Sequence, residues 1–267
     1  MPRAGLADLF ARLAVEAGWI ALDLYERGCA VAAKPDASPV TEADLRAEAA
    51  ILEGLARAAP DLPVVAEETV ARDGPPRCPA RFALVDPLDG TREFVTRNGE
   101  FTVNIALIED GAPTLGIVFA PTLGVLWGGL AGVGAFAETH ARGARAASGR
   151  RAIATRRAPD RLVALASRSH GDPRTEAFLA TLPLASRQSA GSSLKFCRIA
   201  EGVADVYPRF SPTMEWDTAA GHAVLAAAGG IVTTPEGAPF LYGKCEAGYR
   251  NGPFLAWGDP AAAARLR

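Results

Sequence analysis

Residues 82–91 read Phe82-Ala83-Leu84-Val85-Asp86-Pro87-Leu88-Asp89-Gly90-Thr91, an apolar run that ends in acids and turn-forming residues. The apolar residues 82–85 are typical of a buried strand. The proline and the glycine indicate a turn that carries a second carboxylate and a hydroxyl. Because an unpaired carboxylate in a dry site costs several kcal/mol, two acids at the end of a buried strand indicate a cation between them.

Asp86 and Asp89 are the first candidates for ligands of that cation. They lie three positions apart across a Pro-Leu bend, so their side chains can converge on one ion, with the Leu88 carbonyl beside them. Hard oxygen ligands of this kind suit Mg²⁺. An Asx-turn with two exposed acids fits the same residues, and the turn alone leaves both interpretations open. The spacing does argue against the haloacid-dehalogenase type of phosphatase, which needs aspartates two positions apart.

Three more acids occupy positions where strands end or helices begin. Glu67 follows an expected strand. Asp217 opens the apolar helix expected at 217–228, where an acid is also a common N-cap. Asp44 lies three residues after Thr41, close to a capping box, and it also suits the helix dipole. Several acids at such positions favour one shared site.

Two segments have the composition of anion sites. Gly90-Thr91 precedes a short expected helix, residues 92–96, where backbone N–H groups can cradle a phosphate and the hydroxyl can hold a water on the metal. Gly191-Ser192-Ser193-Leu194-Lys195 also leads into a helix, with Ser192 and Lys195 on one face. An ordinary capped helix explains the second segment equally well.

Arg209 and His170 each follow an expected strand and extend the list of candidate anion-binding residues. A lone exposed arginine is usually only solvated, so its position carries little weight by itself. His140 and His222 are interpreted as structural, because His222 lies within the alanine-rich helix after Asp217.

The composition bounds the class of protein. The chain has 267 residues, 49% hydrophobic and 22% charged, which suits one large domain or two packed ones with a sizeable core. A formal charge of −2 without a basic run argues against a nucleic-acid polymer as partner, though not against a small anion. Four scattered cysteines without a CxxC pair argue against zinc and favour a reduced compartment.

The N-terminal residues do not have the pattern of a signal peptide. Acids at Asp8, Glu16 and Asp23 interrupt the apolar positions, and no run approaches the ~20 apolar residues that span a bilayer. We therefore expect a cytoplasmic protein without a transmembrane segment. The sequence leaves open a loose attachment to the cytoplasmic membrane face, and it does not distinguish a monomer from a homodimer.

Hydrophobic periodicity predicts an α+β N-terminal half, residues 1–145, and an α/β C-terminal half, residues 146–267. In the first half, helices at 5–27 and from residue 41 precede strands at 62–66 and 82–85 and an antiparallel meander over 101–138. The charged stretch 140–150 is the predicted boundary. In the second half, expected strands at 162–166, 204–207, 231–233 and 254–257 alternate with expected helices at 172–182, 193–201 and 217–228.

Two motifs in this order resemble the inositol-monophosphatase superfamily of Mg²⁺-dependent, lithium-sensitive phosphatases. They are Asp86-Pro87-Leu88-Asp89-Gly90-Thr91, with Glu67-Glu68 upstream, and Trp216-Asp217-Thr218-Ala219-Ala220-Gly221. Four further strings resemble its CysQ branch, the bacterial 3′(2′),5′-bisphosphate nucleotidases: Arg97-Asn98-Gly99-Glu100-Phe101-Thr102-Val103-Asn104-Ile105-Ala106, Ser167-Arg168-Ser169-His170, Gly191-Ser192-Ser193-Leu194-Lys195-Phe196-Cys197 and Tyr207-Pro208-Arg209-Phe210. The resemblance runs over residues 5–257, with departures mainly in 70–80 and 138–160.

The resemblance implies a layered α-β-α-β-α sandwich and a site for two or three Mg²⁺ ions. The implied metal ligands are Glu67, Asp86, the Leu88 carbonyl, Asp89 and Asp217. Asp44 matches the position that holds a further metal and pairs with the threonine, here Thr91. The implied substrate contacts are Leu88, Asp89, Gly90, Thr91 and Asp217 on the reacting side, and His170, Ser192, Lys195 and Arg209 in the second half of the chain.

The implied substrate is adenosine 3′,5′-bisphosphate, a by-product of sulfate activation, and its sulfated analogue is a second candidate. In this scheme Thr91, with Glu67 or Asp44, orients a water whose pKa one Mg²⁺ lowers, and a second Mg²⁺ neutralises the leaving oxygen. Two alternatives stay open: an inositol monophosphatase or other sugar phosphatase on the same fold, and a catalytically silent nucleotide-binding sensor. Lys195 and Arg209 have little to do in a monophosphatase, and a silent sensor is expected to lack an acid or the threonine.

Overall fold

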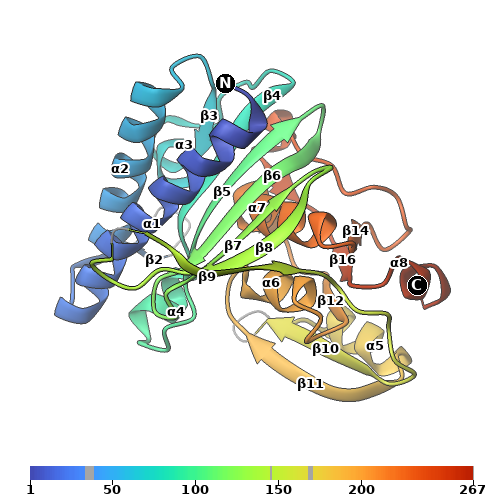
Figure 1. Ribbon diagram of the computed structural model, residues 1–267. Helices are drawn as coiled ribbons and strands as arrows, with labels where there is room; N and C mark the ends of the chain where they lie inside the picture. Colours follow the sequence, from blue (N-terminus) through green and yellow to red (C-terminus); the bar gives the residue numbers. More distant parts are fainter. Residues whose placement is uncertain (34–38, 145, 168–170, 267) are drawn as a thin grey trace.

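Figure 1 shows the computed structural model, which describes residues 1–33, 39–144, 146–167 and 171–266. The first sheet has the strand order β3-β4-β5-β6-β7-β8-β9, with β3 Val64–Ala66, β4 Arg81–Asp89, β5 Thr102–Glu109, β6 Ala112–Ala120, β7 Val125–Leu130, β8 Gly134–Thr139 and β9 Ser148–Ile153. β3 is parallel to β4, and the other neighbours are antiparallel. The meander predicted over 101–138 is confirmed.

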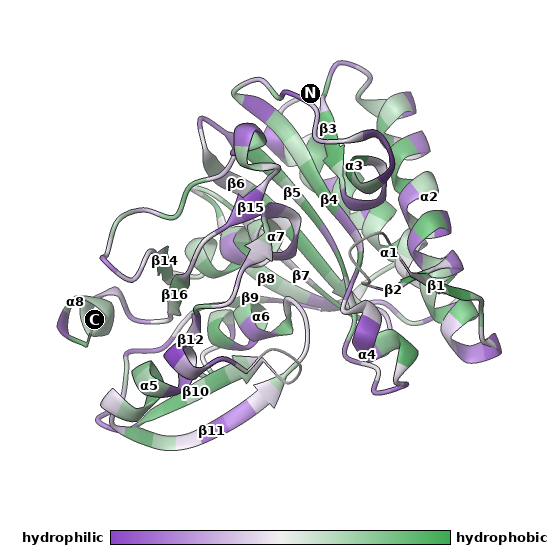
Figure 2. Cartoon of the chain, turned by 180° about the vertical axis from the view of Figure 1, so that it is seen from behind, coloured by the Kyte–Doolittle hydropathy of each residue, from purple (hydrophilic) through white to green (hydrophobic). Residues whose placement is uncertain are grey.

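The central strands of the first sheet are buried on both faces. Its covering helices are α1 Arg3–Arg27 and α2 Glu42–Ala58 on one face, and α6 Leu194–Ala200 and α7 Glu215–Ala227 on the other. Because adjacent residues of a strand point to opposite faces, Val85 packs with α1 and α2, whereas Leu84 packs with α6 and α7. Figure 2 shows how hydrophobic these central strands are. Burial on both sides explains why they read as apolar runs rather than as alternating patterns.

Helix α7 approaches the first sheet closely at two glycines. A Cβ atom at Gly116 would lie 2.3 Å from the Ala220 carbonyl oxygen, and one at Gly129 would lie 2.5 Å from the Cα atom of Val224. Both distances are steric overlaps, so a larger residue at either position would push the helix away. This close packing holds α7, and with it Asp217, against the sheet that carries Asp86.

The second sheet has the strand order β11-β10-β12-β16-β14, with β10 Leu162–Ser167, β11 Leu184–Ala190, β12 Val206–Arg209, β14 Ile231–Thr233 and β16 Phe254–Trp257. β10 is parallel to β11 and β12, whereas β16 is antiparallel to β12 and β14. One face packs on α6 and α7, and the other packs on α5 Pro173–Thr181 and α8 Pro260–Arg265. The layers therefore follow the expected α-β-α-β-α order (Figure 1).

Strands β9 and β11 were absent from the sequence-based prediction because both are polar edge strands. They read SGRRAI and LASRQSA, and most of their residues are exposed. Backbone pairing rather than an apolar face holds them in their sheets, so hydrophobic periodicity does not reveal them. Since β9 pairs with β8, the first sheet extends to Ile153, past the boundary predicted at residue 145.

Short elements complete the fold around the ends of the larger strands. They are β1 Val31–Ala33, β2 Pro39–Thr41, α3 Glu67–Asp73, α4 Thr91–Val95, β13 Thr213–Met214, the 3-10 helix η1 Cys245–Ala247 and β15 Arg250–Asn251. β1 pairs with β2, and β13 pairs with β15. In the ranges that the structure describes, none of the helices has both the length and the apolar character needed to cross a membrane.

Candidate active site

A β-bulge brings Asp86 and Asp89 to the same side of the first sheet. The apolar pattern predicts a strand that ends at Val85, but strand β4 continues to Asp89. Asp86 pairs with Asn104 and Asp89 pairs with Thr102, so two residues of β4 lie opposite one residue of β5. Side chains three positions apart normally point to opposite faces of a strand, and one extra residue restores the same face. The bulge is therefore what makes this spacing suitable for a shared site.

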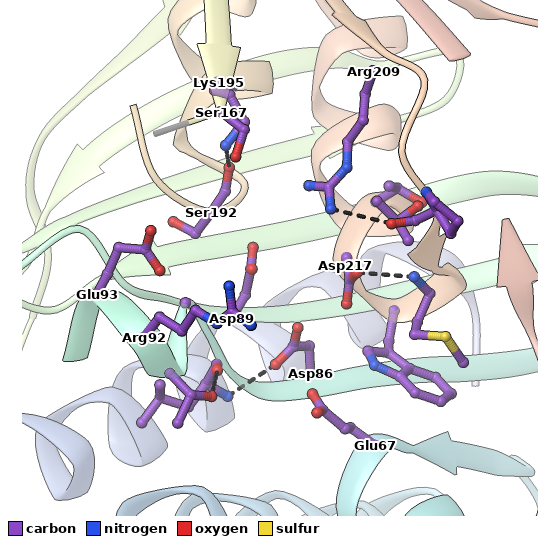
Figure 3. Close-up of a pocket in the computed structure, with 18 of the residues that line it drawn as sticks. Glu67, Asp86, Asp89, Arg92, Glu93, Ser167, Ser192, Lys195, Arg209 and Asp217 are labelled. Carbon is purple, nitrogen blue, oxygen red and sulfur yellow. Dashed lines mark hydrogen bonds between the residues drawn. The ribbon is translucent and has the colours of Figure 1, made fainter. Parts of the chain in front are cut away.

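The bulge opens onto a pocket of about 340 Å³, within the size range of ligand sites in proteins. Ten of the residues predicted for the site line this pocket: Glu67, Asp86, Leu88, Asp89, Gly90, Thr91, Ser192, Lys195, Arg209 and Asp217. Figure 3 shows the four carboxylates around one space, with Arg209 and Lys195 on its far side. Asp44 lies behind Thr91 rather than in the pocket wall. His170 falls outside the described residues.

Each aspartate of the pocket is held by one backbone N–H group. Asp86 Oδ1 accepts from Leu88 N at 3.0 Å, Asp89 Oδ2 accepts from Ser193 N at 2.6 Å, and Asp217 Oδ2 accepts from Met214 N at 2.9 Å. The second oxygen of each accepts no hydrogen bond from the described part of the chain. One buried carboxylate, Asp86, and two partly exposed ones, Asp89 and Asp217, thus keep one oxygen each available for a ligand.

Burial and mutual repulsion make these carboxylates unusually weak acids. Burial raises the pKa of Asp86 well above its usual range, and the nearby charges of Glu67, Asp89 and Asp217 add to that effect. Burial also raises the pKa of Asp89. The pKa of Asp217 rises to about 7, first through burial and then through Asp89 and Glu67. A cation among these groups would remove the repulsion and favour their charged forms.

The donor atoms fit Mg²⁺, which binds hard oxygen ligands and few other groups. Glu67, the three aspartates and the Leu88 carbonyl supply only oxygen. In the described residues, no three or more His, Cys, Asp or Glu side chains already form a group that could hold an ion. Ion binding therefore requires these carboxylates to draw closer together than they stand here.

Thr91 is oriented by Asp44. The Thr91 hydroxyl lies 3.1 Å from Asp44 Oδ1 and 3.3 Å from the Leu88 carbonyl oxygen. The other carboxylate oxygen of Asp44 accepts from the Thr41 N–H at 2.8 Å and from the Thr41 hydroxyl at 2.6 Å, which completes the predicted capping box of α2. Asp44 thus caps α2 and also contacts Thr91. Because its hydroxyl donates to Asp44, Thr91 keeps lone pairs for a donor in the pocket.

Lys195 is buried, and its ammonium group is partly used by the backbone. Its Nζ donates to the carbonyl oxygens of Ala190 at 3.0 Å and Ser192 at 2.7 Å. These two bonds hold the turn that presents the Ser193 N–H to Asp89. Since a lysine ammonium has three hydrogens, one remains for a ligand. Lys195, predicted as an anion-binding residue, therefore also stabilises the turn at residues 190–193.

Arg209 has a buried donor for which the described residues supply no acceptor. One terminal nitrogen of the guanidinium donates to the Pro212 carbonyl at 3.2 Å. Its Nε atom is buried and makes no hydrogen bond within the described residues. A buried donor without a partner is costly, so this arrangement favours an acceptor supplied by a ligand.

Asn104 and Ser193 are part of the site, although the sequence analysis assigned them no role. Asn104 Nδ2 contacts Asp89 Oδ2 at 3.2 Å and Ser193 Oγ at 3.0 Å, and Ser193 Oγ donates to the Asp217 carbonyl at 2.9 Å. These bonds tie the two halves of the site together. Asn104 lies in the longer string that carried the family resemblance, and that was the only signal in the sequence.

His222 is structural, as predicted. It is buried, and its Nδ1 lies 3.0 Å from the Tyr242 hydroxyl. Burial lowers the pKa of His222 to about 3, so the ring is neutral at ordinary pH. It therefore contributes packing rather than charge.

The chain resembles known proteins over nearly its whole length. The sequence model of the inositol monophosphatase family matches residues 6–263. The chain belongs to this family. A 3′(2′),5′-bisphosphate nucleotidase CysQ from Shigella flexneri is 45% identical over 239 residues, which cover 89% of this chain and 94% of that protein. The enzyme of the same name from Salmonella typhimurium is 46% identical over 233 residues, covering 86% of this chain and 91% of that protein.

The family fold is also evident in solved structures. The crystal structure of CysQ from Bacteroides thetaiotaomicron, described as a bacterial member of the inositol monophosphatase family, superimposes with a TM-score of 0.80. It is 36% identical in sequence, and the match covers 95% of this chain and 97% of that one. The match therefore extends over both sheets and over the pocket between them.

Proposed function

We propose that this chain is a Mg²⁺-dependent phosphatase that hydrolyses the 3′-phosphate of adenosine 3′,5′-bisphosphate to AMP and phosphate. The observation that carries the proposal is the set of three aspartates around the Gly90-Thr91 turn, each with one oxygen that accepts no hydrogen bond from the described residues. Identities of 45% and 46% to proteins named 3′(2′),5′-bisphosphate nucleotidases support the substrate class. The sulfated analogue of the substrate is a second candidate.

Glu67, Asp86, the Leu88 carbonyl, Asp89 and Asp217 are the residues that would hold two or three Mg²⁺ ions. When bound, Mg²⁺ supplies a nucleophilic water at neutral pH and positive charge for the transferred phosphoryl group. The backbone N–H groups that hold the aspartates fix their orientation before any ion arrives. The chain's own contribution at this centre is thus concentrated negative charge, which an ion would draw closer together.

Thr91 is the residue we assign to orienting the attacking water. Its hydroxyl hydrogen is directed at Asp44, so its lone pairs can accept a hydrogen bond from that water. Asp44 is in turn fixed by Thr41 at the start of α2. Positioning of this kind and electrostatic stabilisation supply most of the catalysis in phosphoryl transfer.

The second phosphate of the substrate is assigned to Ser192, Lys195 and Arg209, with His170 as a further candidate outside the described residues. Two basic side chains on the wall opposite the carboxylates favour a substrate with more than one anionic group. The remaining hydrogen of Lys195 and the free Nε of Arg209 are the donors available for it.

A substrate panel tests the proposal. The purified chain in Mg²⁺ is offered adenosine 3′,5′-bisphosphate, its sulfated analogue and inositol 1-phosphate, and phosphate release is measured. We expect kcat/KM for the bisphosphate to exceed that for inositol 1-phosphate by at least about tenfold, which is ~1.4 kcal/mol in the barrier. An equal or reversed preference would favour a sugar phosphatase, and no turnover of any substrate would favour a silent sensor.

A further inference from the structure

The pocket has a basic residue for which neither the sequence nor the family motifs predicted a role. Arg250, on β15, lines the pocket but forms no part of the motifs discussed above. We propose that Arg250 is a specificity-determining residue, which acts with Arg209 to bind the second, non-reacting phosphate of the substrate. This inference rests on the proposed function and adds to it the residue that recognises the second anion.

Arg209 and Arg250 flank the same short segment of chain. Arg209 donates to the carbonyl oxygen of Pro212 at 3.2 Å. Arg250 is paired across the β13–β15 ladder with Met214. Both arginines line the pocket. Both arginines therefore adjoin residues 212–214, close to the start of α7, where Asp217 lies.

The backbone under Arg250 is rigid, although its side chain is exposed. Tyr249, the preceding residue, is fully buried and packs against Trp216 with ring centroids 6.3 Å apart. Asn251, the following residue, is buried, and its Nδ2 donates to the Met214 carbonyl at 3.1 Å and contacts the Thr218 hydroxyl at 2.9 Å. A long cationic side chain on a fixed base can reach a ligand without any movement of the main chain.

The guanidinium of Arg250 is free to bind a ligand. Within the described residues it makes no hydrogen bond and no ion pair, in contrast to Arg156, which forms a two-bond contact with Asp205 at 2.8 Å. Its neighbour Arg209 has the buried Nε donor without a partner. Two arginines with unused donors line one pocket, and guanidinium groups bind phosphate oxygens through paired N–H bonds.

Lys195 has only one ammonium hydrogen left for the second phosphate. Its ammonium group is buried and donates to two carbonyl oxygens whether or not substrate is present. Arg250, by contrast, has no task in the protein itself that the structure reveals. The difference in charge between a bisphosphate and a monophosphate is therefore sensed most directly at Arg250 and Arg209.

The test compares two substrates that share the reacting phosphate. Wild type and Arg250→Gln are assayed with adenosine 3′,5′-bisphosphate and with adenosine 3′-monophosphate, which lacks the second phosphate. We expect Arg250→Gln to lower kcat/KM for the bisphosphate by about tenfold, mainly through KM, because a contact far from the reacting atoms contributes uniform binding. Activity on the monophosphate is expected to stay within about twofold of wild type, and Arg250→Lys should recover part of the loss.

Arg198→Gln is the matched control, because Arg198 is an exposed arginine of α6 that does not line the pocket. It removes the same charge and should change neither substrate. Equal losses on both substrates in Arg250→Gln, or no loss on either, would overturn the inference. A wild-type enzyme that does not prefer the bisphosphate over inositol 1-phosphate would instead overturn the proposed function. The two failures can therefore be told apart.

Discussion

The Thr91 hydroxyl and the Asp44 carboxylate are joined by a hydrogen bond of 3.1 Å between residues 47 positions apart in the chain. One end of this bond lies at the turn after the bulge of β4, and the other lies in the first turn of α2. The bond couples the cap of a helix to the orientation of a residue in the pocket. The same carboxylate therefore serves stability through one oxygen and the site through the other.

Asp44→Asn separates these two roles. The amide oxygen can still accept from Thr41, so the cap survives, and the amide nitrogen then faces Thr91 and donates to it. The lone pairs of the Thr91 hydroxyl are consequently engaged by the amide. We expect kcat to fall by about 100-fold, as for loss of a proton-transfer partner, with the free energy of unfolding changed by less than about 1 kcal/mol. Steady-state kinetics and thermal unfolding provide the two measurements, and a kcat within threefold of wild type would contradict the role of Asp44.

Asp89→Asn removes one charge from the mutually repelling carboxylates. Turnover should be lost, because one of the residues proposed to hold Mg²⁺ can no longer supply a carboxylate. The metal-free variant should unfold at the same temperature as metal-free wild type or higher, since burial and nearby acids disfavour this charge in the folded state.

The informative measurement for Asp89→Asn is thermal unfolding with EDTA and with Mg²⁺. Wild type should gain stability from the ion by mass action, and the variant should gain much less. Near-normal activity, or equal stabilisation of both proteins by Mg²⁺, would contradict the assignment of Asp89 as a ligand.

Lys195→Ala should affect both the turn and the substrate. Two buried carbonyl oxygens lose their donor, so we expect a loss of about 2–4 kcal/mol in the free energy of unfolding. Binding of adenosine 3′,5′-bisphosphate should weaken more than binding of a monophosphate, because the remaining ammonium hydrogen is assigned to the second phosphate. Urea unfolding and inhibition constants measure the two effects. Equal weakening for both ligands would leave Lys195 with only its structural role.

The lowered pKa of His222 predicts that the stability of the fold depends on pH. Its pKa falls from 6.5 to about 3 on folding, so the folded state disfavours the protonated ring. The stabilising effect of the neutral ring is present above pH 6.5 and is lost as the pH falls toward 3. Between pH 7 and pH 5 the loss from this one residue is about 2 kcal/mol. Urea unfolding of wild type and His222→Gln across this range should show a steeper decline in wild type, whereas parallel curves would argue against a buried neutral histidine.

Much of the fold follows from local chemistry that is visible in the sequence. The buried strand before Asp86, the capping box of Thr41 and Asp44, and the glycines that end α7 depend on neighbouring residues alone. Hydrophobic periodicity revealed these elements because their burial is what stabilises them. It missed β9 and β11, which are held by backbone hydrogen bonds and present polar side chains to solvent.

The identities of the site residues were determined by the sequence, and their arrangement was decided by the tertiary structure. The aspartates at positions 86 and 89 share a face only because Asp89 pairs with Thr102 across a bulge. The ammonium group of Lys195 is turned toward two carbonyls, and Arg250 is brought beside the start of α7 by its pairing with Met214. Such contacts join residues far apart in the chain, and their geometry depends on strand register and packing, which no local pattern of residues encodes.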